Sequence, residues 1–413
     1  MTRATNRTVR QPRYMRDFVC AADKCIDNCC HRWRVDLDKR TYERYTREVT
    51  DGVLAPLIET HVRRNRHGGG DMDYGYIALR DDGTCPFLTL GQLCRVQKTL
   101  GAEALSFTCR HYPRMQSAIG GDLEQHAAMS CPEIARRIIA DPQALEAEAR
   151  EMPAEDILPR ATVIRPGPAA ERFGLLRSAA VALVDAHAPD VDAGAFAVVM
   201  LAQGVDEYDA TAGGGGPELA PWLAARLRAL ALPAFAANFA RVAVDPSIPL
   251  RLLKEIVIER LAEPGAQKTW PRYLQTIAEC LHGLDYSDDD LERSLRGYQA
   301  AREGFAGFAA SHPWLLRNLA LYDATRNSLF LPGEGPALRQ VLRFVIRYVY
   351  LRFLLTGLHA LWREKFDVEH CVNAAYAFSR AIEHNPGFVG KIAALLEKQE
   401  LHGAAGMAVL LKG

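Results

Sequence analysis

The chain has 413 residues, 49% of them hydrophobic and 24% charged, which is the balance of a globular protein rather than a disordered one. Fifty Lys and Arg residues against fifty Asp and Glu residues give a formal net charge of zero. No overall field therefore attracts nucleic acid or an anionic membrane, and neither is expected as a partner. At about 100–200 residues per domain, a chain of this length is expected to form two or three domains.

The N-terminal segment is rich in arginine and lacks the continuous apolar core of a secretory signal. The most apolar stretch, residues 341–362, is interrupted by Arg343, Arg347 and Arg352, which would be costly near the centre of a bilayer. We expect these arginines to form the solvated edge of an amphipathic helix, with their alkyl stems covering apolar surface. The sequence therefore predicts a cytoplasmic protein without a membrane span.

Few regular elements are predicted in residues 1–140. Apolar periodicity indicates a helix over 36–49 and a short strand over 74–79, and Pro132 suits the first turn of a helix. We expect a loop-rich module stapled by thiolates, because such loops could not otherwise bury enough surface. Residues 141–168 are rich in Pro, Ala and Glu and are expected to connect this module to the rest of the chain.

Residues 169–413 are dominated by helical periodicity and are expected to form an all-α domain. The sequence shows no βαβ alternation, P-loop or dinucleotide-binding fingerprint. The predicted fold class is therefore mainly α, with a loop-rich cysteine-cluster module followed by a helical domain. Helices are predicted over residues 171–186, 221–240, 248–261, 271–284, 288–308, 336–362 and 368–382.

Eight of the ten cysteines precede residue 132. In a reducing cytoplasm, thiols concentrated in this way are more often metal ligands than disulfides, because soft sulfur suits zinc, copper(I) and iron–sulfur clusters. The sequence therefore predicts a metal or cluster held by this group. Its members are Cys20, Cys25, Cys29, Cys30, Cys85, Cys94, Cys109 and Cys131.

The spacing of these cysteines leaves the kind of centre open. No C-x-x-C pair of the zinc-ribbon type occurs, and the ferredoxin-like run that starts at Cys20 and Cys25 has Asn28 where a third cysteine would stand. Adjacent side chains diverge, so Cys29 and Cys30 either serve different sites or divide between binding and packing. The eight thiols would suit two four-thiolate sites, or one site with spare thiols.

Five segments resemble the cysteine blocks of the flagellin lysine N-methyltransferase family. The resemblance covers about residues 14–140 and implies transfer of methyl groups from S-adenosylmethionine to lysine side chains of flagellin. It also implies an iron–sulfur cluster of the 4Fe–4S type, with zinc as the alternative and the eight cysteines as ligands. The segments are CAADKCIDNCCHRW at 20–33, CPFL at 85–88, LCRVQKTLG at 93–101, CRHYPR at 109–114 and SCPE at 130–133.

The residues that would bind the methyl donor and perform the transfer cannot be assigned from the sequence. His31 and His111 adjoin cysteines and are either metal-shell groups or ordinary hydrogen-bonding side chains. Glu369, His370 and Cys371 are of suitable types for catalysis, but consecutive helical residues fan around the axis and do not converge. Tyrosines suit a lysine slot, although each more often serves packing; those of the cysteine module are Tyr42, Tyr45, Tyr74, Tyr76 and Tyr112.

Two other functions are compatible with the same residues. The first is a non-enzymatic zinc or iron–sulfur protein whose cysteine cluster docks a partner. The second is an iron–sulfur redox protein, which would be recognised by reversible reduction. The family resemblance favours the methyltransferase over both.

Overall fold

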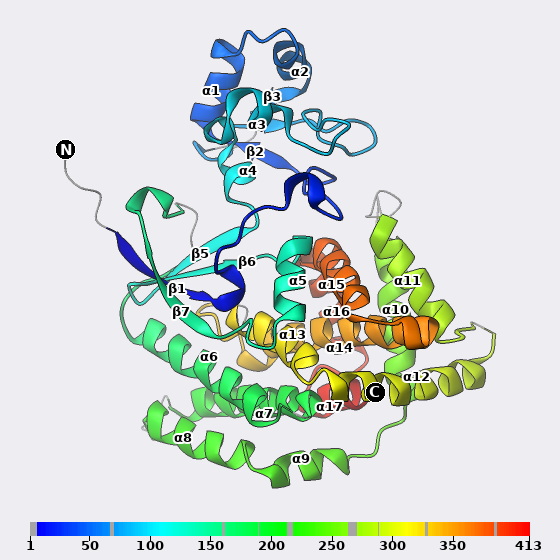
Figure 1. The fold of residues 1–413 in the computed structure, drawn as a ribbon. Coiled ribbons are helices and arrows are strands. Elements are labelled where there is room, and N and C mark those ends of the chain that lie inside the picture. Colours follow the sequence, from blue (N-terminus) through cyan, green and yellow to red (C-terminus); the bar gives the residue numbers. More distant parts are fainter. Residues whose placement is uncertain are drawn as a thin grey trace.

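The computed structural model confirms a mainly α protein, in which a helical body lies below a smaller cysteine-bearing part in Figure 1. None of the helices that the structure describes combines the length and the apolar character needed to cross a bilayer. The structure describes residues 6–66, 70–158, 162–188, 190–212, 218–262, 271–287, 289–326, 329–383 and 386–413.

The helical body begins with α6 and extends to the end of the chain. All of the helices predicted after residue 169 are present in some form. The bounds are α6 (Pro168–Ala186), α7 (Val191–Ala212), α8 (Leu219–Leu230), α9 (Pro233–Ala240), α10 (Ser247–Ala262), α11 (Pro271–Gly283), α12 (Leu291–Ser311), α13 (Trp314–Thr325), α14 (Ala337–Trp362), α15 (Val368–Ile382), α16 (Pro386–Lys398) and α17 (Ala404–Lys412).

The predicted helix over 221–240 is wrong as a single element, because the chain forms α8 and α9 instead. Pro233 disfavours helical backbone at the preceding Leu232, which is extended, and itself starts α9. Four of the described helices of the body were not predicted from the sequence, namely α7, α13, α16 and α17. The first turns of α7 are apolar on nearly every side, so they show little of the amphipathic pattern on which the predictions relied.

Helix α14 is the central element of the body. It packs against α7, α11, α12, α13, α15, α16 and α17. Its residues from Phe344 to Leu358 are buried almost continuously, because neighbouring helices surround it. A helix that is apolar on most sides is therefore explained by burial in protein rather than by a bilayer.

The predicted solvated edge of this helix is wrong for Arg352 and Arg347. Arg352 is only 6% exposed; its guanidinium pairs with Asp192 and donates to the carbonyls of Leu411 and Gly413, both at 2.9 Å. Arg347 forms a largely buried pair with Asp323. Of the three arginines, Arg343 has the most exposed side chain. The helix has little solvent-facing surface because α7 and α17 cover it.

A five-stranded sheet, which was not predicted from the sequence, lies beside the body. Strands β5 and β6 form a hairpin whose turn residues, Gly120 and Gly121, both have the positive φ that a two-residue turn requires. The strand order is β7-β1-β6-β5-β8. The bounds are β1 (Arg7–Pro12), β5 (Arg114–Ile119), β6 (Asp122–Ala127), β7 (Ala147–Met152) and β8 (Thr162–Ile164).

Residues 141–168, expected to be a connection, therefore contribute β7 and β8 to this sheet while they lead into α6. The upper module, defined here as residues 20–112, has a separate small sheet in the order β2-β4-β3. Helix α1 lies within the predicted helix over 36–49, whose first two residues belong to β2 instead, and β4 lies within the predicted strand over 74–79. The bounds are β2 (Val35–Leu37), β3 (Val62–Arg64), β4 (Gly75–Ile77), α1 (Lys39–Glu48), α2 (Leu54–His61), α3 (Arg95–Leu100) and α4 (Phe107–His111).

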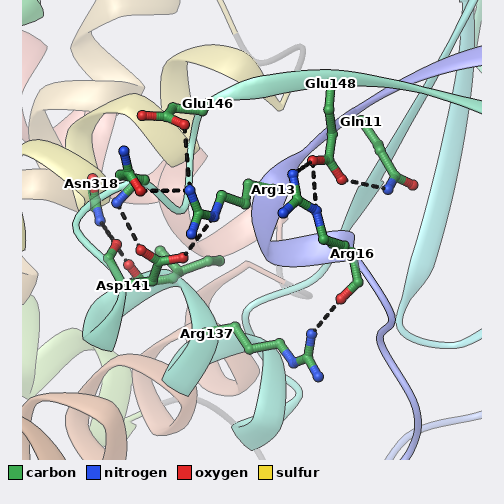
Figure 2. A network of polar contacts seen from close by, with 10 residues as sticks. Gln11, Arg13, Arg16, Arg137, Asp141, Glu146, Glu148 and Asn318 are labelled. Atoms are coloured by element: carbon green, nitrogen blue, oxygen red, sulfur yellow. Dashed lines mark hydrogen bonds and ion pairs between the residues drawn. The ribbon is translucent and has the colours of Figure 1, made fainter.

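A polar network ties the first strand to the body (Figure 2). After the β5–β6 hairpin the chain enters α5 (Pro132–Ala140), whose first residue is the expected proline. The buried Asn318 of α13 donates to the carbonyls of Ile138 and Asp141 at the end of α5, at 2.9 and 2.8 Å. Arg13, just after β1, lies 3.4 Å from the Asp141 carboxylate. The sheet and the helical body are thus held together at α5.

The burial of Arg352 predicts unequal effects for two matched substitutions on α14. Arg352→Met leaves the partly buried Asp192 without its cation and the buried carbonyls of Leu411 and Gly413 without their donor, so it should lower the free energy of unfolding by about 3–5 kcal/mol. Arg343→Met removes only an exposed ion pair with Glu334, whose charged atoms are 3.7 Å apart, and should change the free energy of unfolding by less than about 0.5 kcal/mol. Chemical denaturation of both variants measures this difference. Equal effects would contradict the buried position of Arg352.

Candidate functional site

The eight cysteines of the N-terminal part lie in two groups, and all are free thiols. The inner thiols, defined as Cys30, Cys85, Cys94 and Cys109, pack in the apolar cluster of the upper module. The outer thiols lie toward the helical body: Cys20 is exposed, Cys25 and Cys29 are partly buried, and Cys131 packs against the core of the body. Each group contains four thiols, and the adjacent Cys29 and Cys30 fall into different groups.

Main-chain contacts hold the inner thiols near one another. The N–H of Cys85 donates to the carbonyl of Cys30 at 2.8 Å. Cys94 forms a β-bridge with Leu88, three residues after Cys85. The N–H of Cys109 donates to Ser106 at the start of α4, at 3.2 Å. Segments up to 79 residues apart in sequence, from Cys30 to Cys109, thus meet in one cluster.

Cys29 is the thiol at which the two groups meet. A hydrogen bond from the Cys30 thiol lowers the pKa of Cys29, and the positive charge of Arg380 acts in the same direction. The same hydrogen bond, together with burial, raises the pKa of Cys30. Cys29 also interacts electrostatically with thiols of both groups, namely Cys25, Cys85, Cys94, Cys109 and Cys131.

Two of the thiols lie at the N-terminal ends of helices. Cys94 precedes α3 and Cys131 precedes α5. In each case the backbone N–H groups two and three residues later lower the pKa of the thiol, although burial raises it more, to about 12 for Cys131. Amides directed at sulfur stabilise a thiolate, so both positions suit a sulfur that binds a cation.

Whether these thiols bind a metal stays a prediction. Within the described ranges, no three Cys, His, Asp or Glu side chains are arranged so as to hold a metal ion. Burial raises the pKa of Cys85 to about 11 and that of Cys109 to about 12, so both carry protons at neutral pH unless a cation replaces them. The chemistry of the donors nevertheless fits a soft metal, which displaces such protons on binding.

Arg380 of α15 connects this cysteine region to the helical body. Its guanidinium donates to the carbonyl of Ser130 at 2.7 Å and to that of Asn28 at 3.2 Å, and it pairs with the carboxylate of Asp27. The side chain of Arg380 is only 4% exposed. One buried cation thus joins the loop that carries Cys25 and Cys29, the start of α5 and a helix of the body.

Of the predicted tyrosines, Tyr112 lies at this junction. Its hydroxyl is 2.9 Å from the Ser130 hydroxyl, and its ring centroid is 5.2 Å from that of Trp33. Tyr45 is buried and donates to the carbonyl of Ala104. The remaining three are engaged elsewhere in the upper module, with Tyr42 against Tyr74, Arg64 over Tyr74 and Arg34 over Tyr76.

The other candidates have structural partners. Nδ1 of His31 lies 3.5 Å from the Thr84 hydroxyl, and Nδ1 of His111 lies 2.8 Å from the carbonyl of Phe107. The expected failure of Glu369, His370 and Cys371 to converge is confirmed. His370 caps α15 together with Asp367, Glu369 pairs with Arg136, and Cys371 is buried.

Sequence reasoning missed the contribution of α15. Arg380 and Tyr376 lie about 250 residues after Cys131, and no motif links them to the cysteines. Tyr376 is 1% exposed, and the charges of Asp27 and Arg380 act on its pKa, which burial raises. The nearest available signal was an arginine among apolar residues in the last turn of a helix, and a buried arginine usually implies a partner.

Comparison with known proteins gives matches over most of the chain. The lysine-N-methylases of Salmonella typhimurium and Salmonella choleraesuis are each 27% identical over 393 residues, which cover 92% of this chain and 92% of each relative. The flagellar biosynthetic protein FliU of Salmonella muenchen is 35% identical over 143 residues, 33% of this chain and 80% of FliU. No solved structure matches.

The family model described as the FliB lysine N-methylase C-terminal domain matches residues 177–410. This range contains most of α6 and continues into α17, so it takes in Tyr376 and Arg380. The model matches more than half of the chain, and the chain therefore belongs to the FliB lysine N-methylase family.

Proposed function

We propose that this protein transfers methyl groups from S-adenosylmethionine to lysine side chains of flagellin. Family membership carries the proposal, because relatives matched along 92% of the chain are named lysine-N-methylases. The flagellar name of a third relative, FliU, supports flagellin as the substrate.

The transfer itself is a polar displacement. The lone pair of a neutral lysine amine forms the new N–C bond while the C–S bond of the sulfonium breaks. S-adenosylhomocysteine leaves with the electron pair, and the methylated ammonium releases its proton to solvent. The reaction requires no electron transfer. The protein must therefore position the lysine amine, exclude water and favour the neutral form of the amine. The charged groups around Arg380 can influence the last of these requirements.

We propose further that the inner thiols hold an iron–sulfur cluster of the 4Fe–4S type. Four thiols from four segments meet in one apolar cluster, and although burial raises the pKa of Cys94, backbone N–H groups at the start of α3 act to lower it. When bound, such a group would supply a covalent centre around which short, loop-rich segments are ordered. The outer thiols would then form a second set, with Cys29 adjoining both.

The methyl transfer can be measured directly on purified components. We expect intact-mass spectrometry to show methylated lysines on flagellin after incubation with the protein and S-adenosylmethionine. Flagellin whose lysines have been acetylated is the matched control. Its mass should not increase, because the lone pair of an acetylated nitrogen is delocalised into the amide and is no longer nucleophilic. Unmodified flagellin with a folded, metal-loaded enzyme would contradict the proposed activity.

Metal content separates an inner-thiol centre from other arrangements. Cys94→Ser should reduce iron and acid-labile sulfide in anaerobically purified protein and lower the free energy of unfolding by about 3 kcal/mol or more, because ligation is coupled to folding. Cys280→Ser is the control: Cys280 is buried in the helical body, and a serine there can also donate to the carbonyl of Phe353.

The control variant should keep its full metal content. Full iron and sulfide in Cys94→Ser would remove Cys94 from the centre. A colourless wild-type protein that contains zinc instead of iron would replace the iron–sulfur cluster with a zinc site.

A further inference from the structure

Two hydroxyl groups on α15 are buried without a hydrogen-bond partner. The Tyr376 side chain is 1% exposed and that of Ser379 is not exposed at all, and neither hydroxyl has a partner in good hydrogen-bond geometry within the described ranges; the Arg272 side chain approaches the Tyr376 hydroxyl and lowers its pKa, although burial raises that pKa more. Folded proteins pair nearly all of their buried polar groups, so an exception calls for a physical reason. The two residues are three positions apart on one helix and therefore lie on neighbouring parts of its surface.

The other buried tyrosines near this region are satisfied. Tyr273 and Tyr350 share a hydrogen bond of 2.6 Å, and Tyr14 accepts from the N–H of Ala127 at 3.2 Å. Tyr322 accepts from the N–H of Met129 at 2.8 Å. Among the residues that the structure describes, Tyr376 is the one tyrosine whose fully buried hydroxyl lacks a partner.

The surroundings of Tyr376 lie at the junction with the cysteine region. The charges of Asp27, Arg272 and Arg380 all act on its hydroxyl. The Asp27 side chain is 24% exposed, and Arg272, at the start of α11, is exposed. The Tyr376 ring is part of the hydrophobic core of the body, but partly exposed charged groups act on its hydroxyl, and a long, thin side chain from a partner protein could reach the hydroxyl from their side.

We propose that the hydroxyls of Tyr376 and Ser379 receive the amine of the substrate lysine. The inference rests on the proposed methyl transfer and identifies the amine slot of that reaction. The hydroxyl oxygens accept from the N–H groups of the amine, which leaves the nitrogen lone pair free for attack. Both residues become fully hydrogen-bonded only when the lysine is bound, which accounts for their lack of partners without it.

The local charges suit a neutral amine. Arg272 and Arg380 place positive charge near the hydroxyl, and a like charge disfavours an ammonium ion. The carboxylate of Asp27, which pairs with Arg380, exerts the largest single charge effect on the hydroxyl and opposes the two arginines, whereas burial acts with them because it also disfavours the ammonium ion. The slot therefore favours the unprotonated form that methyl transfer requires, and it holds the charged product less tightly than a purely acidic site would.

The decisive test compares Tyr376→Phe with Tyr350→Phe. Tyr376→Phe removes an unpaired buried hydroxyl, so the melting temperature should stay the same or rise, while kcat for flagellin falls about tenfold to a hundredfold. Tyr350→Phe breaks a satisfied pair in the core, so the melting temperature should fall while kcat stays within about twofold. Ser379→Ala should behave like Tyr376→Phe. Affinity for S-adenosylmethionine should remain unchanged in all three variants.

A binding measurement without turnover separates this inference from the proposed activity. We expect Nα-acetyl-lysine amide to bind wild-type protein saturably, and to bind Tyr376→Phe about tenfold more weakly than Tyr350→Phe in an NMR titration. Equal affinity in the two variants, no saturable binding to wild type, or an unchanged kcat in Tyr376→Phe would overturn the amine slot. Lysine binding that depends on Tyr376 in a protein that cannot methylate flagellin would overturn the proposed activity instead.

Discussion

The arrangement of the site depends on the buried guanidinium of Arg380. It pairs with Asp27 and donates to the carbonyls of Asn28 and Ser130, so it fixes the cysteine loop and the start of α5 on the helical body. A buried cation is costly unless its N–H groups are paired, and the segments that supply its partners are thereby held in place. Its charge also favours a thiolate at Cys29 and opposes further positive charge near Tyr376.

The contacts of Arg380 connect the upper module to the helical body and bring the chemical groups of the two parts together. The upper module contributes thiols from segments that meet in one small apolar cluster, and its helices and strands are short. The body contributes α15, which is held by α5, α11, α14 and α16. A centre bound by the thiols would order the loop that carries Asp27, and the loop would in turn complete the surroundings of Tyr376. The cysteines would thus affect methyl transfer through position rather than electron transfer.

The sequence was most informative where patterns are local. The sequence predicted the mainly α class from the helical periodicity of segments such as α14 and α15. It also revealed the proline at the start of α5 and the concentration of cysteines. The five-stranded sheet was not predicted, because β5 and β6 contain few β-branched residues and the pairings that extend their hairpin into a sheet are with the distant strands β1 and β8. Likewise the burial of Arg352, and the meeting of Arg380 with Asp27 across 353 residues, are set by tertiary packing alone.

Hydrogen exchange in an Arg380→Lys variant tests the junction most directly. Lysine keeps the charge but cannot reproduce the forked pattern of donors that reaches Asp27, Asn28 and Ser130 together. Amides in residues 26–33 and 128–131 should exchange faster than in wild type, while those of α14 keep their protection. Unchanged exchange in both segments would contradict a site held together by Arg380.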